Sequence, residues 1–246
     1  MLKIYQKSWH SINFSELKSP ISFKNLPGEN FYIEFYEKFN EKYENLNQLD
    51  KKWLLLKNKA ADEINKNLNN SKNSSILSLG AGLGVIEKKL YDFGYKNLYI
   101  QEVSKKATIY SREFLEEERF FIGTFPDCIN NNYKFDYILL SAIEYLFNDK
   151  ELENLLFNVR RFMHKKSKLI ILSTSIDEES AVFQIKAIIK RVLIKIRLFD
   201  PGQFWGYARK LKELKRISKK IGFKIRIAKL DKTIKPWTTG FLFLDN

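Results

Sequence analysis

Short apolar stretches alternate with longer segments of helical periodicity from about residue 74 onward. The apolar stretches predict strands at residues 76–79, 97–101, 120–122, 135–140 and 169–173. Between them, apolar residues recur at helical spacing and predict helices at residues 85–93, 105–118 and 152–164. Strands that alternate with helices of this length predict an α/β fold with a mostly parallel sheet and helices on both faces.

The residues on either side of this alternating segment have a different pattern. Large apolar residues at helical spacing predict two helices within residues 31–68, separated near residues 45–50. After residue 175 the pattern predicts a basic amphipathic helix at 181–199, a break at Pro201 and Gly202, and a helix at 209–221. Strands at 223–230 and 240–244 follow. The predicted single domain consists of an N-terminal helical cover (1–70), a core (71–175), a basic helical insertion after the fifth strand (176–222) and a strand pair (223–246) that completes a seven-stranded sheet.

The composition is that of a globular protein. Of the 246 residues, 44% are hydrophobic and 15% are aromatic, which is too much for a disordered chain. The longest apolar stretches are far shorter than the roughly 18 residues that cross a bilayer, and the first residues lack the apolar core of a signal peptide. We therefore expect a cytoplasmic protein. A single cysteine, Cys128, and two histidines predict neither an internal disulfide nor a bound metal.

The net charge of +14 is concentrated in one part of the chain. Residues 183–235 contain 17 Lys or Arg residues and three acidic residues, whereas the rest of the chain has 26 of each sign. A neutral body with a basic segment indicates an anionic partner, such as a phosphorylated small molecule, a nucleic acid or a membrane surface. A solvated lysine-rich face explains the same charge without any partner.

A glycine turn follows the first predicted strand of the core. Gly80, Gly82 and Gly84 leave no side chain between the backbone and a ligand at the start of the next helix. Glu102 follows 22 residues after Gly80, at the end of the next strand, where a carboxylate can accept hydrogen bonds from ribose hydroxyls. The dinucleotide fingerprint requires another glycine where this chain has Val85. The turn therefore favours a different nucleoside cofactor.

This arrangement resembles the class I S-adenosylmethionine-dependent methyltransferases, which have a Rossmann-like fold with G-x-G-x-G after the first strand and an acidic residue after the second. The resemblance covers residues 74–175 and extends to the last two strands. It implies that S-adenosylmethionine is the cofactor. The residues that it places beside the cofactor follow four strands and are Gly80, Ala81, Gly82 and Gly84, then Glu102 and Val103, then Thr124 and Phe125, and finally Ser141 and Ala142. The chain departs from the family at Ser78 and at Gly123 to Phe125, where acidic residues are usual.

The same resemblance limits the methyl acceptor. Residues 141–145 read Ser-Ala-Ile-Glu-Tyr, without the Pro-Pro-aromatic motif of enzymes that methylate the amino groups of DNA bases. Cys128 follows Asp127, not the proline that usually precedes the nucleophile for cytosine C5 methylation. We therefore expect that nucleic acid is not the acceptor.

Methyl transfer is an in-line displacement, which requires alignment of the nucleophile and exclusion of water more than a strong acid or base. Candidate weak bases are Glu144, Tyr207 and His10. Candidate acceptor-binding residues are Tyr32 and Tyr36, which could wall the pocket, and Trp205 and Arg209, which belong to an aromatic cluster with an arginine that can hold an anion through paired hydrogen bonds.

Together these observations predict a methyltransferase that acts on the oxygen or nitrogen of a small anionic metabolite or a surface-glycan precursor. Three alternatives stay open: a nucleic-acid methyltransferase that uses the basic insertion, a membrane-surface protein that lies on helix 181–199, and a non-catalytic cofactor-binding protein. The oligomeric state is not indicated by the sequence.

Overall fold

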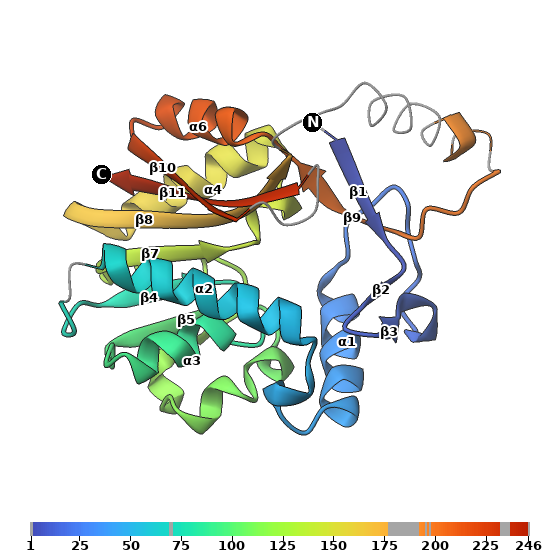
Figure 1. The fold of residues 1–246 in the computed structure, drawn as a ribbon, viewed down its shortest axis with the longest axis horizontal. Helices are drawn as coiled ribbons and strands as arrows, with labels where there is room; N and C mark the ends of the chain where they lie inside the picture. Colours follow the sequence, from blue (N-terminus) through green and yellow to red (C-terminus); the bar gives the residue numbers. More distant parts are fainter. Residues whose placement is uncertain are drawn as a thin grey trace.

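The structure is a computed structural model that describes residues 2–68, 71–176, 192–194, 196, 198–231 and 237–245. Its centre is a seven-stranded sheet with the strand order β10-β11-β8-β7-β4-β5-β6 (Figure 1). Five neighbouring strands are parallel: β4 (Ile76–Leu79), β5 (Leu98–Glu102), β6 (Phe120–Ile122), β7 (Phe135–Ser141) and β8 (Met163–Ile176). β11 (Trp237–Asp245) pairs antiparallel with both β8 and β10 (Lys224–Asp231). The predicted fold class is confirmed.

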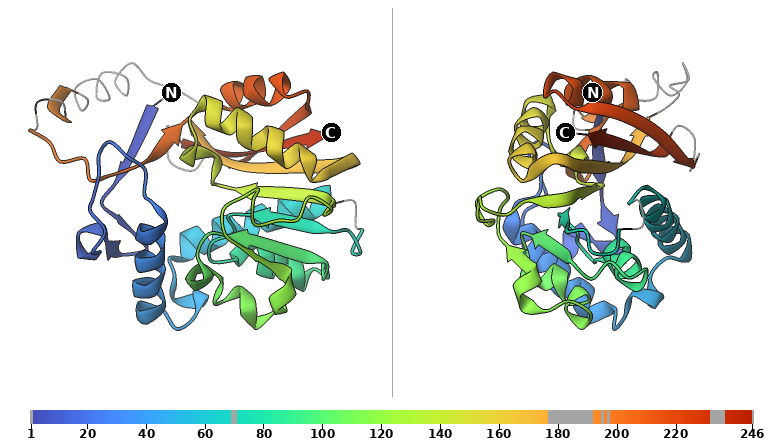
Figure 2. Two further views of the ribbon diagram at one scale, coloured as in Figure 1. Left: turned by 180° about the vertical axis from the view of Figure 1, so that it is seen from behind. Right: turned by 90° about the vertical axis from the view of Figure 1, so that its left-hand side faces the viewer.

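Helices cover both faces of this sheet, because strand residues alternate between two apolar clusters. One face packs against α4 (Asp149–Arg161) and α6 (Leu211–Lys220), and its strands contribute side chains such as Leu77 and Leu79. The other face packs against α2 (Lys51–Asn67) and α3 (Val85–Asp92), and includes Ile76. Figure 2 shows α4 and α2 on opposite sides of the sheet. Within the described residues, no helix has the length and apolar character to cross a membrane.

The N-terminal segment differs from the predicted helical cover. Two helices form as expected, α1 (Glu29–Lys42) and α2, but α2 packs on the sheet through Ala60, Ala61 and Ile64. Three short strands precede them: β1 (Leu2–Gln6), β2 (Ser8–Trp9) and β3 (Ile12–Asn13). Turns η1 (Phe14–Glu16) and η2 (Leu46–Gln48) complete the segment.

The predicted insertion also contains an unexpected strand. β9 (Gln203–Ala208) pairs antiparallel with β1, so the N-terminus and residues far along the chain build one ribbon. α1, the β1–β9 ribbon and β2–β3 stand together beyond one end of the main sheet (Figures 1 and 2). We call these elements the cover. α6, which the sequence assigns to the insertion, instead packs on the sheet through Leu211, Leu214 and Ile217. Most of the predicted basic helix 181–199 lies outside the described residues.

The α-helix predicted at residues 105–118 is replaced by three short 3-10 helices, η3 (Lys105–Thr108), η4 (Ser111–Glu113) and η5 (Glu117–Arg119). The apolar residues of this segment pack in different directions. Ala107 and Tyr110 join the aromatic cluster of the cover, whereas Leu115 joins the apolar cluster on the sheet face that α2 and α3 cover. A single helix presents one apolar face, and it could not serve both clusters.

Candidate active site

A cavity of about 540 Å³ lies between the carboxyl ends of β4, β5 and β7 and the cover. This is the edge of a parallel sheet where ligands bind in open α/β folds. All ten residues predicted to contact the cofactor line it: Gly80, Ala81, Gly82, Gly84, Glu102, Val103, Thr124, Phe125, Ser141 and Ala142. Of the predicted acceptor-binding residues, Tyr32, Tyr36 and Trp205 line it as well.

The glycine turn forms the floor of this cavity and has a conformation that favours glycine. Gly80, Gly82 and Gly84 have φ angles of 61°, 58° and 70°. A Cβ atom on Gly84 would lie 2.0 Å from Ser111 Oγ, and one on Gly80 would lie 2.8 Å from Ile143 Cγ2. A Cβ atom on Gly82 would meet only the Tyr36 hydroxyl, at 3.1 Å. The turn is therefore wedged between its neighbours, with Gly82 facing the cavity wall that α1 supplies.

Glu102 holds the turn in place. Its Oε2 atom accepts a hydrogen bond from the Gly82 N–H at 2.9 Å, and its Oε1 atom accepts one from the Val103 N–H at 2.8 Å. The side chain is buried, and burial raises the pKa of Glu102 while the backbone N–H groups oppose that shift. Each carboxylate oxygen can accept a further hydrogen bond from a ligand.

A buried acidic residue compensates for the missing acid at Ser78. Glu87 reaches back from the first turn of α3, and its Oε1 atom accepts a hydrogen bond from Ser78 Oγ at 2.5 Å. Both side chains are fully buried, and burial raises the pKa of Glu87. A carboxylate from α3 thus lies beside Ser78, the position where the resemblance led us to expect an acidic residue on the strand. An acid in the first turn after the glycines was the available sequence signal, but we did not predict its role.

Lys57 is a cavity residue that the sequence analysis missed. It extends from α2, and its Nζ atom donates a hydrogen bond to Ser141 Oγ at 3.4 Å and lies 5.4 Å from the centre of the Trp53 ring. Burial lowers the pKa of Lys57, and the nearby carboxylates Glu87 and Glu144 counteract that effect. Its position four residues after Trp53 on one helical face was the only signal in the sequence.

Aromatic rings from the cover enclose the cavity on the side opposite the sheet. Trp9 stacks on Phe35 with ring centres 4.9 Å apart, and Trp205 stacks on Phe14 at 5.1 Å. Burial raises the pKa values of Tyr32, Tyr36 and Tyr145, which line the same wall, so their phenols are neutral at pH 7. These packed rings limit the access of water to the cavity.

The three predicted bases lie outside the cavity lining. Burial raises the pKa of Glu144 to about 7, but this buried side chain is hydrogen bonded to Ser173 and does not line the cavity. Burial and the charge of Lys57 lower the pKa of His10 to about 4, and its ring packs edge-on against Trp53. Tyr207 faces the outer side of the ribbon, where its ring contacts Phe204. The geometry therefore does not bring these residues to a bound acceptor.

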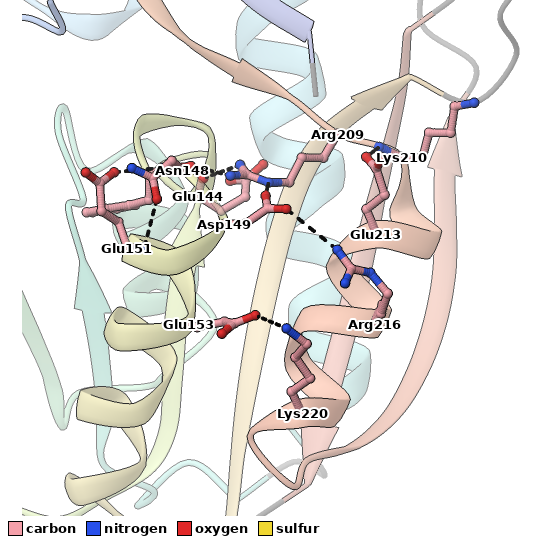
Figure 3. A network of polar contacts seen from close by, with 11 residues as sticks. Glu144, Asn148, Asp149, Glu151, Glu153, Arg209, Lys210, Glu213, Arg216 and Lys220 are labelled. Atoms are coloured by element: carbon pink, nitrogen blue, oxygen red, sulfur yellow. Dashed lines mark hydrogen bonds and ion pairs between the residues drawn. The ribbon is translucent and has the colours of Figure 1, made fainter.

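The predicted anion contact, Arg209, is also placed elsewhere. Its side chain is only 2% exposed and does not line the cavity. It donates hydrogen bonds to Asp149 Oδ1 at 3.0 Å, to the Glu144 carbonyl at 3.1 Å and to the Phe147 carbonyl. Figure 3 shows the guanidinium inside this network, between the turn at Glu144 and the start of α4. Because its nitrogen atoms already donate to these protein oxygens, Arg209 anchors the turn. The prediction that Arg209 binds the methyl acceptor is therefore wrong.

No known family profile and no curated protein sequence matches this chain. Solved structures of similar fold include the mitomycin 7-O-methyltransferase MmcR, with 17% identity, a TM-score of 0.54, and coverage of 77% of this chain and 53% of that one. Human N-acetylserotonin methyltransferase in complex with S-adenosylmethionine has 13% identity, a TM-score of 0.53, and coverage of 87% and 56%. The present chain therefore spans about half the length of these two proteins.

Magnesium protoporphyrin IX methyltransferase from Synechocystis PCC 6803, with bound S-adenosylhomocysteine, matches over most of both chains. It has 13% identity, a TM-score of 0.54, and coverage of 93% of this chain and 89% of that one. These likenesses show that the chain has the fold of the class I methyltransferases.

Proposed function

We propose that this protein transfers the methyl group of S-adenosylmethionine to a small-molecule acceptor. The observation that carries the proposal is the glycine turn, held by the buried carboxylate of Glu102, on the floor of an aromatic cavity at the carboxyl ends of β4, β5 and β7. The methyltransferase structures with the same fold, two of which contain S-adenosylmethionine or its demethylated product, support it.

The residues on the cavity floor fit this cofactor chemically. Glu102 has free lone pairs for ribose hydroxyls, and the glycine turn allows close approach to the backbone. Glu87 and Lys57 offer one negative and one positive group for the ammonium and carboxylate of the methionine part. Thr124 and Phe125, beside which the resemblance implies the adenine, also line the cavity.

S-adenosylmethionine supplies an electrophilic methyl group on a sulfonium. The protein's task is then to align the acceptor and exclude water. The aromatic wall of Tyr32, Tyr36 and Trp205 excludes water, and ring faces also favour a nearby cation such as the sulfonium. With Glu144, His10 and Tyr207 outside the cavity lining, we propose that proximity and orientation contribute more to the rate than a side-chain base.

The predictions drawn from the basic segment stay predictions. An anionic metabolite, a nucleic acid and a membrane surface were each inferred from charges within residues 183–235, whereas no motif carries the surface-glycan precursor. Most of the basic helix among them lies outside the described residues, and Arg209, the most specific contact in that inference, is bound within the turn network.

Calorimetric titration with S-adenosylhomocysteine tests the proposal. Gly82→Ala should weaken binding at least about tenfold, which corresponds to about 1.4 kcal/mol, because the added methyl group enters the space between the turn and Tyr36. Gly94→Ala is the matched control. Gly94 also has a positive φ, 99°, but an added Cβ atom would meet only Lys72, away from the cavity. Equal affinities for the wild type and both variants, or no binding at all, would contradict the proposal.

A further inference from the structure

We infer that the methyl acceptor is a small uncharged aromatic molecule, packed against the rings of the cover and hydrogen bonded to the side-chain amide of Gln6. This inference rests on the proposed function, whose acceptor it defines by chemical class. It is drawn from the part of the cavity that the β1–β9 ribbon and α1 supply.

The ribbon presents one of its faces to the cavity. Side chains alternate along a strand, and accordingly Ile4 and Gln6 of β1 both line the cavity. Trp205 of β9 lies at the register irregularity between the pairs Ile4–Gly206 and Tyr5–Phe204, and it lines the same cavity. The rings of Tyr5 and Phe204 contact each other with centres 5.8 Å apart and do not line the cavity. The strand pairing therefore fixes which side chains face the acceptor.

Aromatic rings form the walls around this position. The centre of the Trp205 ring lies 5.9 Å from that of Trp9 and 6.3 Å from that of Tyr32, and both pairs are tilted, at 58° and 55°. All three side chains line the cavity. Rings at these distances and angles pack on one another and form a continuous aromatic wall, and a planar aromatic ligand can pack against it through its face or its edge. An aliphatic polyol would bury its hydroxyl groups there without partners.

Gln6 provides a polar group that the protein itself does not satisfy. Its Oε1 atom is buried and has no hydrogen-bond partner among the described residues. Gln203, directly opposite on β9, is different: its Oε1 atom accepts from the Ser22 N–H at 2.8 Å, and its Nε2 atom donates to the carbonyls of Asn25 and Phe204. A buried amide oxygen without a donor is costly, and a ligand hydroxyl that donates a hydrogen bond to it would relieve that cost.

Among the described residues of the lining, the charged side chains lie at the cofactor end of the cavity. In the described lining, the charged side chains are Lys57, Glu87 and Glu102, which lie at the glycine turn and at Ser141. The ribbon side contributes only the neutral amide of Gln6 and apolar or phenolic side chains. An ion bound among these rings would lose its hydration without a counter-ion, whereas a neutral aromatic molecule loses little.

The test uses three probes of similar shape with the full-length protein, in the presence of saturating S-adenosylhomocysteine. 2-Naphthol carries a neutral hydroxyl, 2-methylnaphthalene lacks it, and 2-naphthoate carries a negative charge. Calorimetry on the wild type should give affinities for 2-naphthol about fivefold higher than for 2-methylnaphthalene, as expected for one neutral hydrogen bond, and at least about tenfold higher than for 2-naphthoate. Gln6→Leu should remove the preference for the hydroxyl while leaving the affinity for 2-methylnaphthalene unchanged.

Each outcome decides the inference. Binding of 2-naphthoate as tight as that of 2-naphthol would overturn it, as would a hydroxyl preference that persists in Gln6→Leu. The comparison of the three probes on the wild type holds even if the variant folds poorly. If S-adenosylhomocysteine binds but 2-naphthol does not, the acceptor class is wrong and the proposed function stands. If S-adenosylhomocysteine does not bind, both fail.

Discussion

At the scale of single residues, burial decides the chemistry of Glu144. The side chain is 3% exposed and its Oε2 atom has no hydrogen-bond partner among the described residues. Arg209 and Lys57 favour the charged form, but the loss of hydration outweighs them and raises the pKa to about 7. The folded protein therefore holds a proton on Glu144 at pH values where the unfolded chain has released it.

The stability of the protein should reflect this proton. Between about pH 4.5 and 7 the folded state binds more protons at Glu144 than the unfolded state, so this residue lowers the free energy of unfolding as the pH rises. Glu144→Gln removes that dependence. The free energy of unfolding of the variant, relative to that of the wild type, should therefore increase by about 1–3 kcal/mol from pH 5 to pH 8. Urea unfolding at both pH values measures this difference.

His10 should change the stability with pH in the opposite direction to Glu144. Its pKa is lowered to about 4, so the unfolded state binds more protons between pH 4 and 6.5, and the contribution of His10 to stability rises with pH. In His10→Asn that increase should disappear, and the left-handed backbone at this position, with φ of 46°, suits asparagine. If both variants followed the wild-type pH dependence, the assigned burial of these groups would be incorrect.

At the scale of elements, Arg209 joins three parts of the chain. It follows β9 directly, and its guanidinium binds the carbonyls at both ends of η6 (Glu144–Leu146) and the carboxylate of Asp149 at the start of α4 (Figure 3). The turn that carries Tyr145 into the cavity is thereby tied to the ribbon. Close packing adds to this connection, because a Cβ atom on Gly206 would lie 2.5 Å from the Tyr145 carbonyl oxygen.

Arg209→Met should therefore lower the free energy of unfolding by about 2–4 kcal/mol, because it leaves buried carbonyl groups without donors. Arg216→Met is the control. Arg216 contacts the same Asp149, at 3.6 Å, but its side chain is 59% exposed, and the expected loss is below about 1 kcal/mol. Urea unfolding of both variants measures the difference. Equal small losses would mean that Arg209 does not anchor the turn.

At the scale of the whole molecule, the aromatic cluster of the cover includes residues of the core. Phe14, Phe35 and Phe39 of the N-terminal segment pack in the same cluster as Leu83 of the glycine turn and Tyr110 beside η4. The cover therefore cannot unfold without exposing residues that lie beside the candidate cofactor site.

We therefore expect the protein to unfold in one cooperative transition. Three of its four tryptophans line the cavity, Trp9 and Trp205 from the cover and Trp53 from α2, so their fluorescence reports on the contact between the cover and the core, whereas far-ultraviolet circular dichroism reports mainly on the sheet and its helices. In urea the two signals should have the same midpoint, and saturating S-adenosylhomocysteine should raise both together. A fluorescence transition at lower urea would show instead that the cover opens independently.

Much of the fold and of the cofactor site could be predicted from the sequence because their signals are local. Each strand and helix of the core has its own periodicity within a few residues, except at 105–118, where apolar side chains serve two clusters. The glycine turn and Glu102 each follow a strand, and parallel strands bring such positions to one edge of a sheet.

The roles of Gln6, Lys57 and Arg209 were decided only by the tertiary structure. β1 and β9 are about 200 residues apart, and no local pattern indicates that they pair or which of their faces meets the cavity. Lys57 and Arg209 are both basic residues near aromatic neighbours in the sequence. Lys57 nevertheless lines the cavity, whereas Arg209 donates its hydrogen bonds to oxygen atoms of a turn. Whether a charged side chain binds a ligand or the protein itself depends on which acceptors surround it, and distant segments supply those acceptors.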